Sequence, residues 1–257
     1  MKTKIIAVSN QKGGVGKTTT AVSLAAGLAK EGREVLLVAL DPQGQCAITL
    51  GLKPEPGTFY LLTMGNSPQE NSFVRQYIRN TGRERLWLLA GDQTTMAAQT
   101  IINAESRPVS CIRDAISRFT RNGLNYIIFD TAPSVGGIQE RAIWAADMVV
   151  IPTSTEYLST DSVRKITDTM LILQREKAWQ GALLGVLPTF YHDQLREHRA
   201  AMQDLQAGFG ERVLPPVHRS TTLSECPGES KTIFEKDPRS RSAIEYQALV
   251  DLVIKYS

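Results

Sequence analysis

Residues 10–19 read Asn-Gln-Lys-Gly-Gly-Val-Gly-Lys-Thr-Thr, and this stretch decides the fold. An apolar run at residues 5–8 precedes it, and a helix-type pattern at 21–29 follows. Strand, glycine loop and helix in this order are the setting of a phosphate-binding loop. Glycines let the loop turn its N–H groups toward an anion, and the helix that begins near Gly16 adds the positive end of its dipole. The sequence therefore predicts a site for the phosphates of a nucleotide.

Two side chains of this loop have a defined chemistry in such a site. Lys17 can reach the β- and γ-phosphates, and the Thr18 hydroxyl is placed to ligate Mg²⁺. The residues expected to hold the nucleotide run from the loop into the helix: Lys12, Gly13, Gly14, Val15, Gly16, Lys17, Thr18 and Thr19.

The loop departs from the common pattern G-x-x-x-x-G-K-[ST]. Gln11 stands where the first glycine is usual, and a second lysine, Lys12, follows it. The form K-G-G-x-G-K-T resembles the deviant loop of the ParA/MinD family of ATPases. The resemblance implies a homodimer in which Lys12 reaches the phosphates held by the partner subunit. Such a cation would neutralise charge that develops during phosphoryl transfer, so Lys12 and Lys17 are candidate catalytic residues and dimerisation would depend on ATP.

A second motif, Asp41-Pro42-Gln43-Gly44-Gln45, follows a strand expected at 35–40. A carboxylate at the end of that strand can position the attacking water or hold a magnesium-bound water, so Asp41 is a candidate catalytic and metal residue. The family form is D-x-D-P-Q-G-N, and in this chain Ala39 occupies the position of the first Asp. ATP binding would survive this change, whereas hydrolysis would be slowed. Two explanations stay open: an engineered substitution that traps the ATP state, or a natural feature, since the related nitrogenase iron protein also lacks this Asp.

The third motif is the apolar run 126–129 ending in Asp130, a Walker-B-type signal. Asp130 would hold magnesium through water, opposite Thr18. The segment 130–134, D-T-A-P-S, resembles the family form D-x-P-P-S. Residues 151–157 resemble I-P-x-x-P-E-Y, except that Thr155 replaces the second proline, and the resemblance places this segment beside the nucleotide and the dimer interface.

The C-terminal third continues the resemblance. Residues 223–227 resemble L-S-E-A-P, and residues 237–241 match D-P-R-S-R. The likeness therefore runs from about residue 4 to residue 255, and it is weakest at 53–120.

The same resemblance implies two further contact regions. It places adenine contacts near Thr189-Phe190 and at Pro215 and Val217. It places DNA contacts on a basic region that here contains Arg196, Arg199 and Arg219. Contacts of this kind would go to phosphate and would be independent of base sequence.

Alternation of strand-type and helix-type segments predicts an α/β fold, a mostly parallel twisted sheet with helices on both faces. We expect strands at 4–9, 35–40, 86–90, 125–130, 147–152, 182–188 and 213–214, and helices at 17–31, 108–121, 137–145, 160–178, 194–208 and 241–255. The segment 53–82 is expected to be a surface excursion with a short helix or two. Residues 1–257 would form a single P-loop ATPase domain with its ligands at the carboxyl ends of the strands.

Composition excludes several other classes. No apolar run approaches the length of a membrane span and no secretory signal is visible, so we expect a cytoplasmic protein, and the resemblance implies that it associates with the nucleoid. The net charge of +3 permits contact with nucleic acid without establishing it.

The three cysteines lack C-x-x-C spacing, and an electron-transfer iron protein would need paired interface cysteines. The histidines, His192, His198 and His218, have no ligand-like spacing, so packing or solvent-facing roles are expected.

The function predicted from these features is that of a ParA-type partition ATPase. It would bind ATP and Mg²⁺, dimerise, bind double-stranded DNA non-specifically and move a plasmid, a chromosome or a protein cargo with a ParB-type adaptor. The alternative is a MinD-type positioning ATPase on a membrane, which needs an amphipathic C-terminal helix, whereas residues 249–257 resemble a helix that packs on the sheet. A non-enzymatic nucleotide sensor is a further possibility that Ala39 favours.

Overall fold

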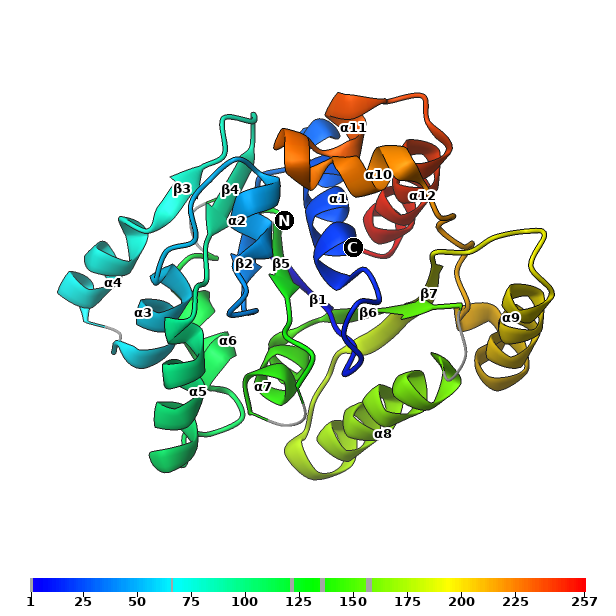
Figure 1. Cartoon of the computed structure of the whole chain (residues 1–257). Coiled ribbons are helices and arrows are strands. Elements are labelled where there is room, and N and C mark those ends of the chain that lie inside the picture. Colours follow the sequence, from blue (N-terminus) through cyan, green and yellow to red (C-terminus); the bar gives the residue numbers. More distant parts are fainter. Residues whose placement is uncertain (1, 66, 121–122, 135–136, 156–158) are drawn as a thin grey trace.

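The computed structural model describes residues 2–65, 67–120, 123–134, 137–155 and 159–257. Within them, one sheet of seven strands has the order β3-β4-β2-β5-β1-β6-β7 (Figure 1). Its neighbouring strands are parallel except for β3, which pairs antiparallel with β4. The strands are β1 (Lys4–Val8), β2 (Val35–Ala39), β3 (Ile78–Asn80), β4 (Leu86–Leu89), β5 (Tyr126–Asp130), β6 (Met148–Ser154) and β7 (Ala182–Thr189).

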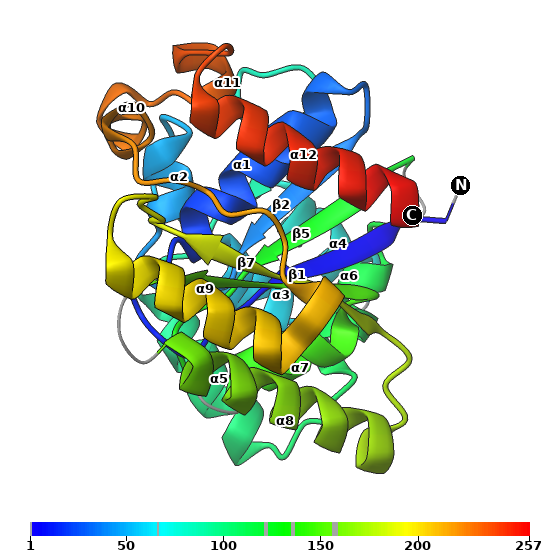
Figure 2. The ribbon, with the colours of Figure 1, turned by 90° about the vertical axis from the view of Figure 1, so that its right-hand side faces the viewer.

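Helices cover both faces of this sheet, as Figures 1 and 2 show. The α-helices are α1 (Lys17–Lys30), α2 (Gln45–Thr49), α3 (Gly57–Thr63), α4 (Pro68–Arg75), α5 (Thr94–Ala104), α6 (Cys111–Ser117), α7 (Gly137–Ala145), α8 (Ser159–Lys177), α9 (Arg196–Phe209), α10 (Thr221–Glu225), α11 (Ile233–Lys236) and α12 (Arg241–Tyr256). Because parallel strands are buried on both faces, their residues are almost continuously apolar.

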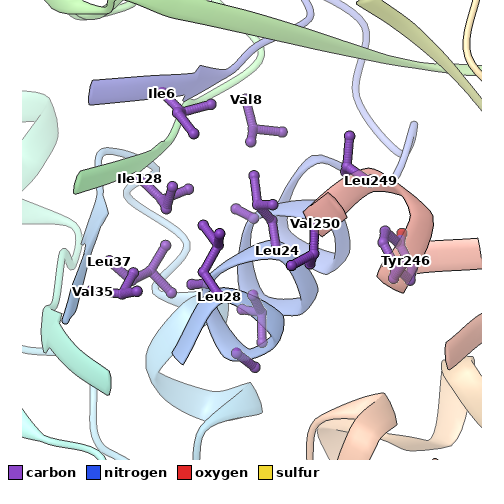
Figure 3. Packing of buried hydrophobic residues seen from close by; sticks show 14 of the residues in the cluster. Ile6, Val8, Leu24, Leu28, Val35, Leu37, Ile128, Tyr246, Leu249 and Val250 are labelled. Atoms are coloured by element: carbon purple, nitrogen blue, oxygen red, sulfur yellow. The ribbon is translucent and has the colours of Figure 1, made fainter. Parts of the chain in front are cut away.

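The two faces have separate apolar cores. On one face, α1, α2 and α12 pack on the sheet, and Figure 3 shows Leu24 and Leu28 of α1 between the strands and Val250 of α12. A Cβ on Gly27 would lie 2.4 Å from a Val250 methyl carbon, so this glycine lets α1 and α12 approach closely. On the other face, α3 and α5 to α8 bury their apolar sides. The strands β2 to β5 lie on one side of β1, and β6 and β7 lie on the other side. The strand order therefore changes direction at β1, and α/β folds bind ligands at such a switch point.

The expected fold class is confirmed, and six of the expected strands are present with ends shifted by one or two residues. The expected strand at 213–214 is wrong, because only Val213 makes an isolated bridge, with Val186. Sequence reasoning missed β3, α5 and the short helices α2, α10 and α11. It also described 53–82 as a surface excursion, whereas Leu61 and Val74 from this segment are fully buried in the second core. None of the described helices is long and apolar enough to cross a membrane.

Candidate functional site

The glycine loop connects the carboxyl end of β1 to the first turn of α1. Gly14 and Gly16 have positive φ values of 70° and 81°, so the left-handed backbone that glycine favours turns the chain here. Open space surrounds Gly13 and Gly14, because a Cβ built on either residue would meet no atom within 4 Å. The loop therefore presents exposed backbone at the start of a helix, which is a suitable place for an anion.

Asn10 anchors this loop to the sheet and to α8. Its Oδ1 accepts a hydrogen bond from the Lys12 N–H (3.0 Å), and its Nδ2 donates to the carbonyl of Pro152 (2.8 Å) and to Ser162 Oγ (3.3 Å). The side chain is fully buried. Sequence reasoning assigned Asn10 no role, although its position directly before the loop was a usable signal.

Lys17 points into the loop that precedes it. Its side chain is buried, and its ammonium group donates to the carbonyl oxygen of Lys12 at 2.8 Å. Burial lowers the pKa of Lys17, while the nearby carboxylates of Asp130 and Asp41 act in the opposite direction. A bound phosphate would add a compensating negative charge to this buried cation. Lys12 itself is half-buried at the loop entrance.

Asp130 ends β5 beside the first turn of α1. Its Oδ2 accepts hydrogen bonds from Thr18 Oγ1 (2.8 Å) and from the thiol of Cys46 (3.1 Å). Burial raises the pKa of Asp130 to about 6, although both hydrogen bonds act to lower it. Sequence reasoning gives Cys46 no role in the site. Its place five residues after Asp41, in the segment leaving β2, was the only signal of a site role.

The donor set fits magnesium. Asp130 Oδ1 is buried and has no hydrogen-bond partner among the described residues, so a polar or cationic partner is missing from the protein. Asp41 lies nearby with a mostly buried side chain, and its Oδ1 accepts from the Gln43 N–H at 2.9 Å. The described residues contain no group of three His, Cys, Asp or Glu side chains that could hold a metal by itself. Mg²⁺ would accordingly need phosphate oxygens and water as further ligands, which is its usual habit.

A cavity of about 420 Å³ adjoins the loop where α1 begins. It is lined by Gly16 and Thr19 of the loop region, Thr189 at the end of β7, Phe190, Val217, and Tyr246 of α12. Thr189 Oγ1 donates to the carbonyl of Val15 at 3.0 Å, which joins the β7 end to the loop. The cavity has both apolar surface and hydroxyl groups next to the phosphate loop, so it is shaped for the base and sugar of a nucleotide.

The structure brings some of the expected adenine-contact residues to this cavity and leaves one outside. Thr189, Phe190 and Val217 line it, whereas Pro215 is exposed and does not. Side chains in this segment alternate between solvent and the interior. Pro215 faces solvent, while the Val217 N–H donates to the Pro188 carbonyl and the Val217 side chain is buried.

Two of the expected DNA-contact arginines lie on α9, and the third lines the cavity. Arg196 and Arg199 are exposed on α9, and the Arg199 guanidinium donates to the carbonyl of Asp193 (2.7 Å). Arg219 is exposed and lines the cavity. These three residues are therefore accessible to solvent.

The histidines have structural partners. His198 is buried on α9, with its Nδ1 2.9 Å from Thr155 Oγ1. His218 Nε2 lies 3.1 Å from an Asp193 oxygen, and its Nδ1 contacts Glu245. Residues 156 and 157 of the expected I-P-x-x-P-E-Y segment lie outside the described residues, and Thr155, directly before them, is buried.

Comparison with known proteins agrees with this geometry. A family model described as an AAA domain matches residues 3–180. The chromosome partitioning protein ParA of Myxococcus xanthus is 33% identical over 250 residues, which cover 96% of this chain and 86% of that protein. Apo McdA from Cyanothece has a TM-score of 0.86 at 19% identity, with 98% and 99% of the two chains covered, which shows a shared fold.

A third relative was solved with ligands. Cobyrinic acid a,c-diamide synthase from Mycobacterium smegmatis, with a bound ATP analogue and magnesium, has a TM-score of 0.81 at 27% identity. The similarity covers 99% of this chain and 95% of the synthase. The loop, the two strand-end carboxylates and these likenesses together confirm the resemblance seen in the sequence, and the chain belongs to the ParA/MinD family of deviant Walker A P-loop ATPases.

Proposed function

We propose that this chain is an ATP-dependent, dimerising ATPase that binds DNA non-specifically and positions a plasmid, a chromosome or a protein cargo. One observation carries the nucleotide-binding part of the proposal: Lys17 and Asp130 are both buried next to the start of α1, and Asp130 Oδ1 has no hydrogen-bond partner among the described residues. A cation and an uncompensated carboxylate at a helix N-terminus suit the charges of a magnesium–triphosphate pair.

Different residues of the site would bind the phosphates, the metal and the attacking water. The loop N–H groups and Lys17 would hold the β- and γ-phosphates, while Thr18 and Asp130 would hold Mg²⁺ directly and through water. When bound, Mg²⁺ supplies charge neutralisation on the phosphate oxygens. Asp41 would orient the attacking water, and burial of the site would exclude other water molecules.

The dimer and its partners extend this proposal. Lys12 of each subunit would contact the nucleotide of the other, so ATP would join two subunits and hydrolysis would release them. Arg196, Arg199 and Arg219 are exposed and would contact DNA phosphates in the dimer. The proposed setting is the cytoplasm, where a ParB-type or other cargo adaptor would stimulate hydrolysis. The support for a partition role is the similarity to the ParA protein of Myxococcus xanthus.

A membrane-bound version of this switch has less support. It would need an amphipathic helix whose apolar side is available to lipid. In α12, Leu249, Val250 and Val253 are buried, and this helix packs on α1 (Figure 3).

The test is size-exclusion chromatography with ATP and Mg²⁺ against ADP and Mg²⁺, followed by a duplex-DNA mobility shift. We expect a dimer and a shift with ATP only. A Lys12→Ala variant should still bind ATP yet remain a monomer, while Lys53→Ala, at an exposed position, should behave as the parent does. A protein that stays monomeric at saturating ATP would contradict the proposal.

A further inference from the structure

Asp130 lies between two apolar neighbours in the sheet. Its register partner on β1 is Val8, and its register partner on β2 is Ala39. Register partners in parallel strands point to the same face, so neither neighbouring strand supplies a hydrogen-bond donor to this carboxylate. The donors must therefore come from the helices that cover the face.

Two helices supply those donors, and both donate to the same oxygen. Thr18 of α1 and Cys46 of α2 each donate to Asp130 Oδ2, while Oδ1 has no partner among the described residues. In the proposed function Thr18 has a second task, because its oxygen ligates Mg²⁺. Cys46 has no such task, so its thiol can hold Oδ2 while Oδ1 is available to a magnesium-bound water.

The position of Cys46 is set by the turn that leaves β2. Gly44 has a φ of 64°, and a Cβ there would lie 2.7 Å from Pro54, so the chain needs glycine to enter α2 at this point. Cys46 is fully buried in the core between α1 and the sheet. Burial raises the pKa of its thiol, and the neighbouring Asp130 adds to this effect, so the group remains an S–H donor.

We propose that Cys46 is a positioning residue for magnesium: its thiol hydrogen bond orients the Asp130 carboxylate and stabilises it for metal-bound water. The inference rests on the proposed function, since it assumes that Mg²⁺ and a triphosphate occupy this site. Groups that hydrogen-bond a metal-binding carboxylate orient it, and their loss typically weakens metal binding by about 10- to 100-fold.

The experiment measures retention of a fluorescent ATP analogue by anisotropy while Mg²⁺ is titrated, and it repeats the measurement in EDTA. The variants are Cys46→Ala, which removes the donor, and Cys46→Ser, which keeps an O–H donor. Cys111→Ala is the matched control, because this cysteine lies on α6 and packs against the core on the other face of the sheet from Cys46. Thermal unfolding of each variant reports whether its fold is intact.

The expected result is specific to the metal. Cys46→Ala should raise the Mg²⁺ concentration for half-maximal retention about ten-fold, at the lower end of such effects because a thiol is a weak donor. Retention in EDTA should not change, and Cys46→Ser should restore the Mg²⁺ response. An unchanged Mg²⁺ midpoint in Cys46→Ala would overturn the inference, as would an equal loss with and without Mg²⁺ or a failure of Cys46→Ser to restore it.

The same titration separates this inference from the proposed function. If the parent protein retains no ATP analogue at any Mg²⁺ concentration, the proposed function fails and the role of Cys46 fails with it. If the parent responds to Mg²⁺ and Cys46→Ala responds identically, only the role of Cys46 is wrong.

Discussion

The phosphate loop and the neighbouring cavity form two halves of one candidate site, and they are built in opposite ways. The loop comes from one continuous stretch, residues 10–19, whose glycines and lysines carry their chemistry locally. The cavity is lined by residues from α1, the β7 end, the chain near Val217, and α12. A local motif can be read from its own residues, whereas a composite cavity depends on the packing of segments that are far apart in sequence.

The two halves also differ in their electrostatics. Buried charges dominate the loop region, with Lys17 and Asp130 both shifted in pKa by burial. The cavity is lined by hydroxyl, aromatic and aliphatic groups, with Arg219 at an exposed position. Substitutions in the loop should therefore have larger effects than substitutions in the cavity, because unpaired buried charge is more unfavourable than lost apolar contact.

The largest effect is expected for Lys17→Ala. Loss of the buried ammonium group should weaken ATP binding by at least about 100-fold, since a charge-assisted contact to phosphate is lost. Tripolyphosphate, which has no base, should lose affinity by a similar factor in a competition assay. The control is Lys53→Ala at an exposed position. Normal tripolyphosphate binding by Lys17→Ala would remove this lysine from the phosphate site.

Asp130→Asn should remove the contribution of this carboxyl to the pH dependence of stability in Mg²⁺-free buffer. The folded carboxyl has a pKa raised to about 6, against about 4 when unfolded, so the folded state binds more protons between these values. Stability of the parent therefore falls as pH rises through this window. At pH 8 the variant should unfold about 5 °C higher than the parent, and the difference should vanish near pH 4.

The measurement is calorimetry at both pH values. Asp251→Asn, on the exposed side of α12, is the control and should show no such difference. The stabilised Asp130→Asn protein should also lose the Mg²⁺ dependence of ATP retention, which would separate its effect on binding from its effect on folding. A variant that is less stable at pH 8 than the parent would refute the assignment of the buried charge.

Phe190→Ala tests the cavity half by itself. Phe190 lies near Gly16, and removal of its ring should weaken ATP binding about ten-fold through lost contact with the base. Tripolyphosphate binding should stay unchanged, in contrast to Lys17→Ala. Tyr256→Ala, an exposed aromatic residue on α12, is the control. Equal loss of both ligands would show that the two halves do not act separately.

The Ala39→Asp variant tests whether the phosphate-loop half of the site lacks a catalytic carboxylate. Restoring a carboxylate beside Asp130 should raise ATP turnover several-fold, by about one order of magnitude at most. Phosphate release is the measurement, and Ala39→Asn is the control for side-chain size. Because Ala39 is buried and is the register partner of Asp130, the new carboxylate should also lower stability. An unchanged rate in a folded variant would mean that Ala39 does not limit hydrolysis.

The smallest effect is expected outside both halves, at an exposed charge. Arg199→Glu should weaken duplex-DNA binding by about three-fold at moderate salt and reduce the salt dependence slightly, because one phosphate contact is lost. Lys53→Glu gives the same charge change at another exposed position. Equal effects from both variants would indicate general charge attraction and remove Arg199 as a specific contact.

Much of the fold followed from local patterns. Apolar runs buried on both faces identified β1, β2, β4, β5, β6 and β7, because a parallel strand covered on both sides has no polar face. The short edge strand β3 lacks this signal, since Ile78 is half-buried and the other two residues are exposed. The segment 53–82 looked like a surface region because its Gly, Pro and Asn content reflects its turns, while its buried residues depend on the helices that pack over them.

The sequence by itself determined the phosphate loop, the strand-end carboxylates Asp41 and Asp130, and the family, because these depend on residues within short, continuous stretches. Only the tertiary structure decided which side chains surround them. It placed Cys46 on Asp130, brought Val217 into the cavity and left Pro215 in solvent. The physical reason is that hydrogen bonds and burial depend on distances between elements, and those distances are set when the helices pack on the sheet.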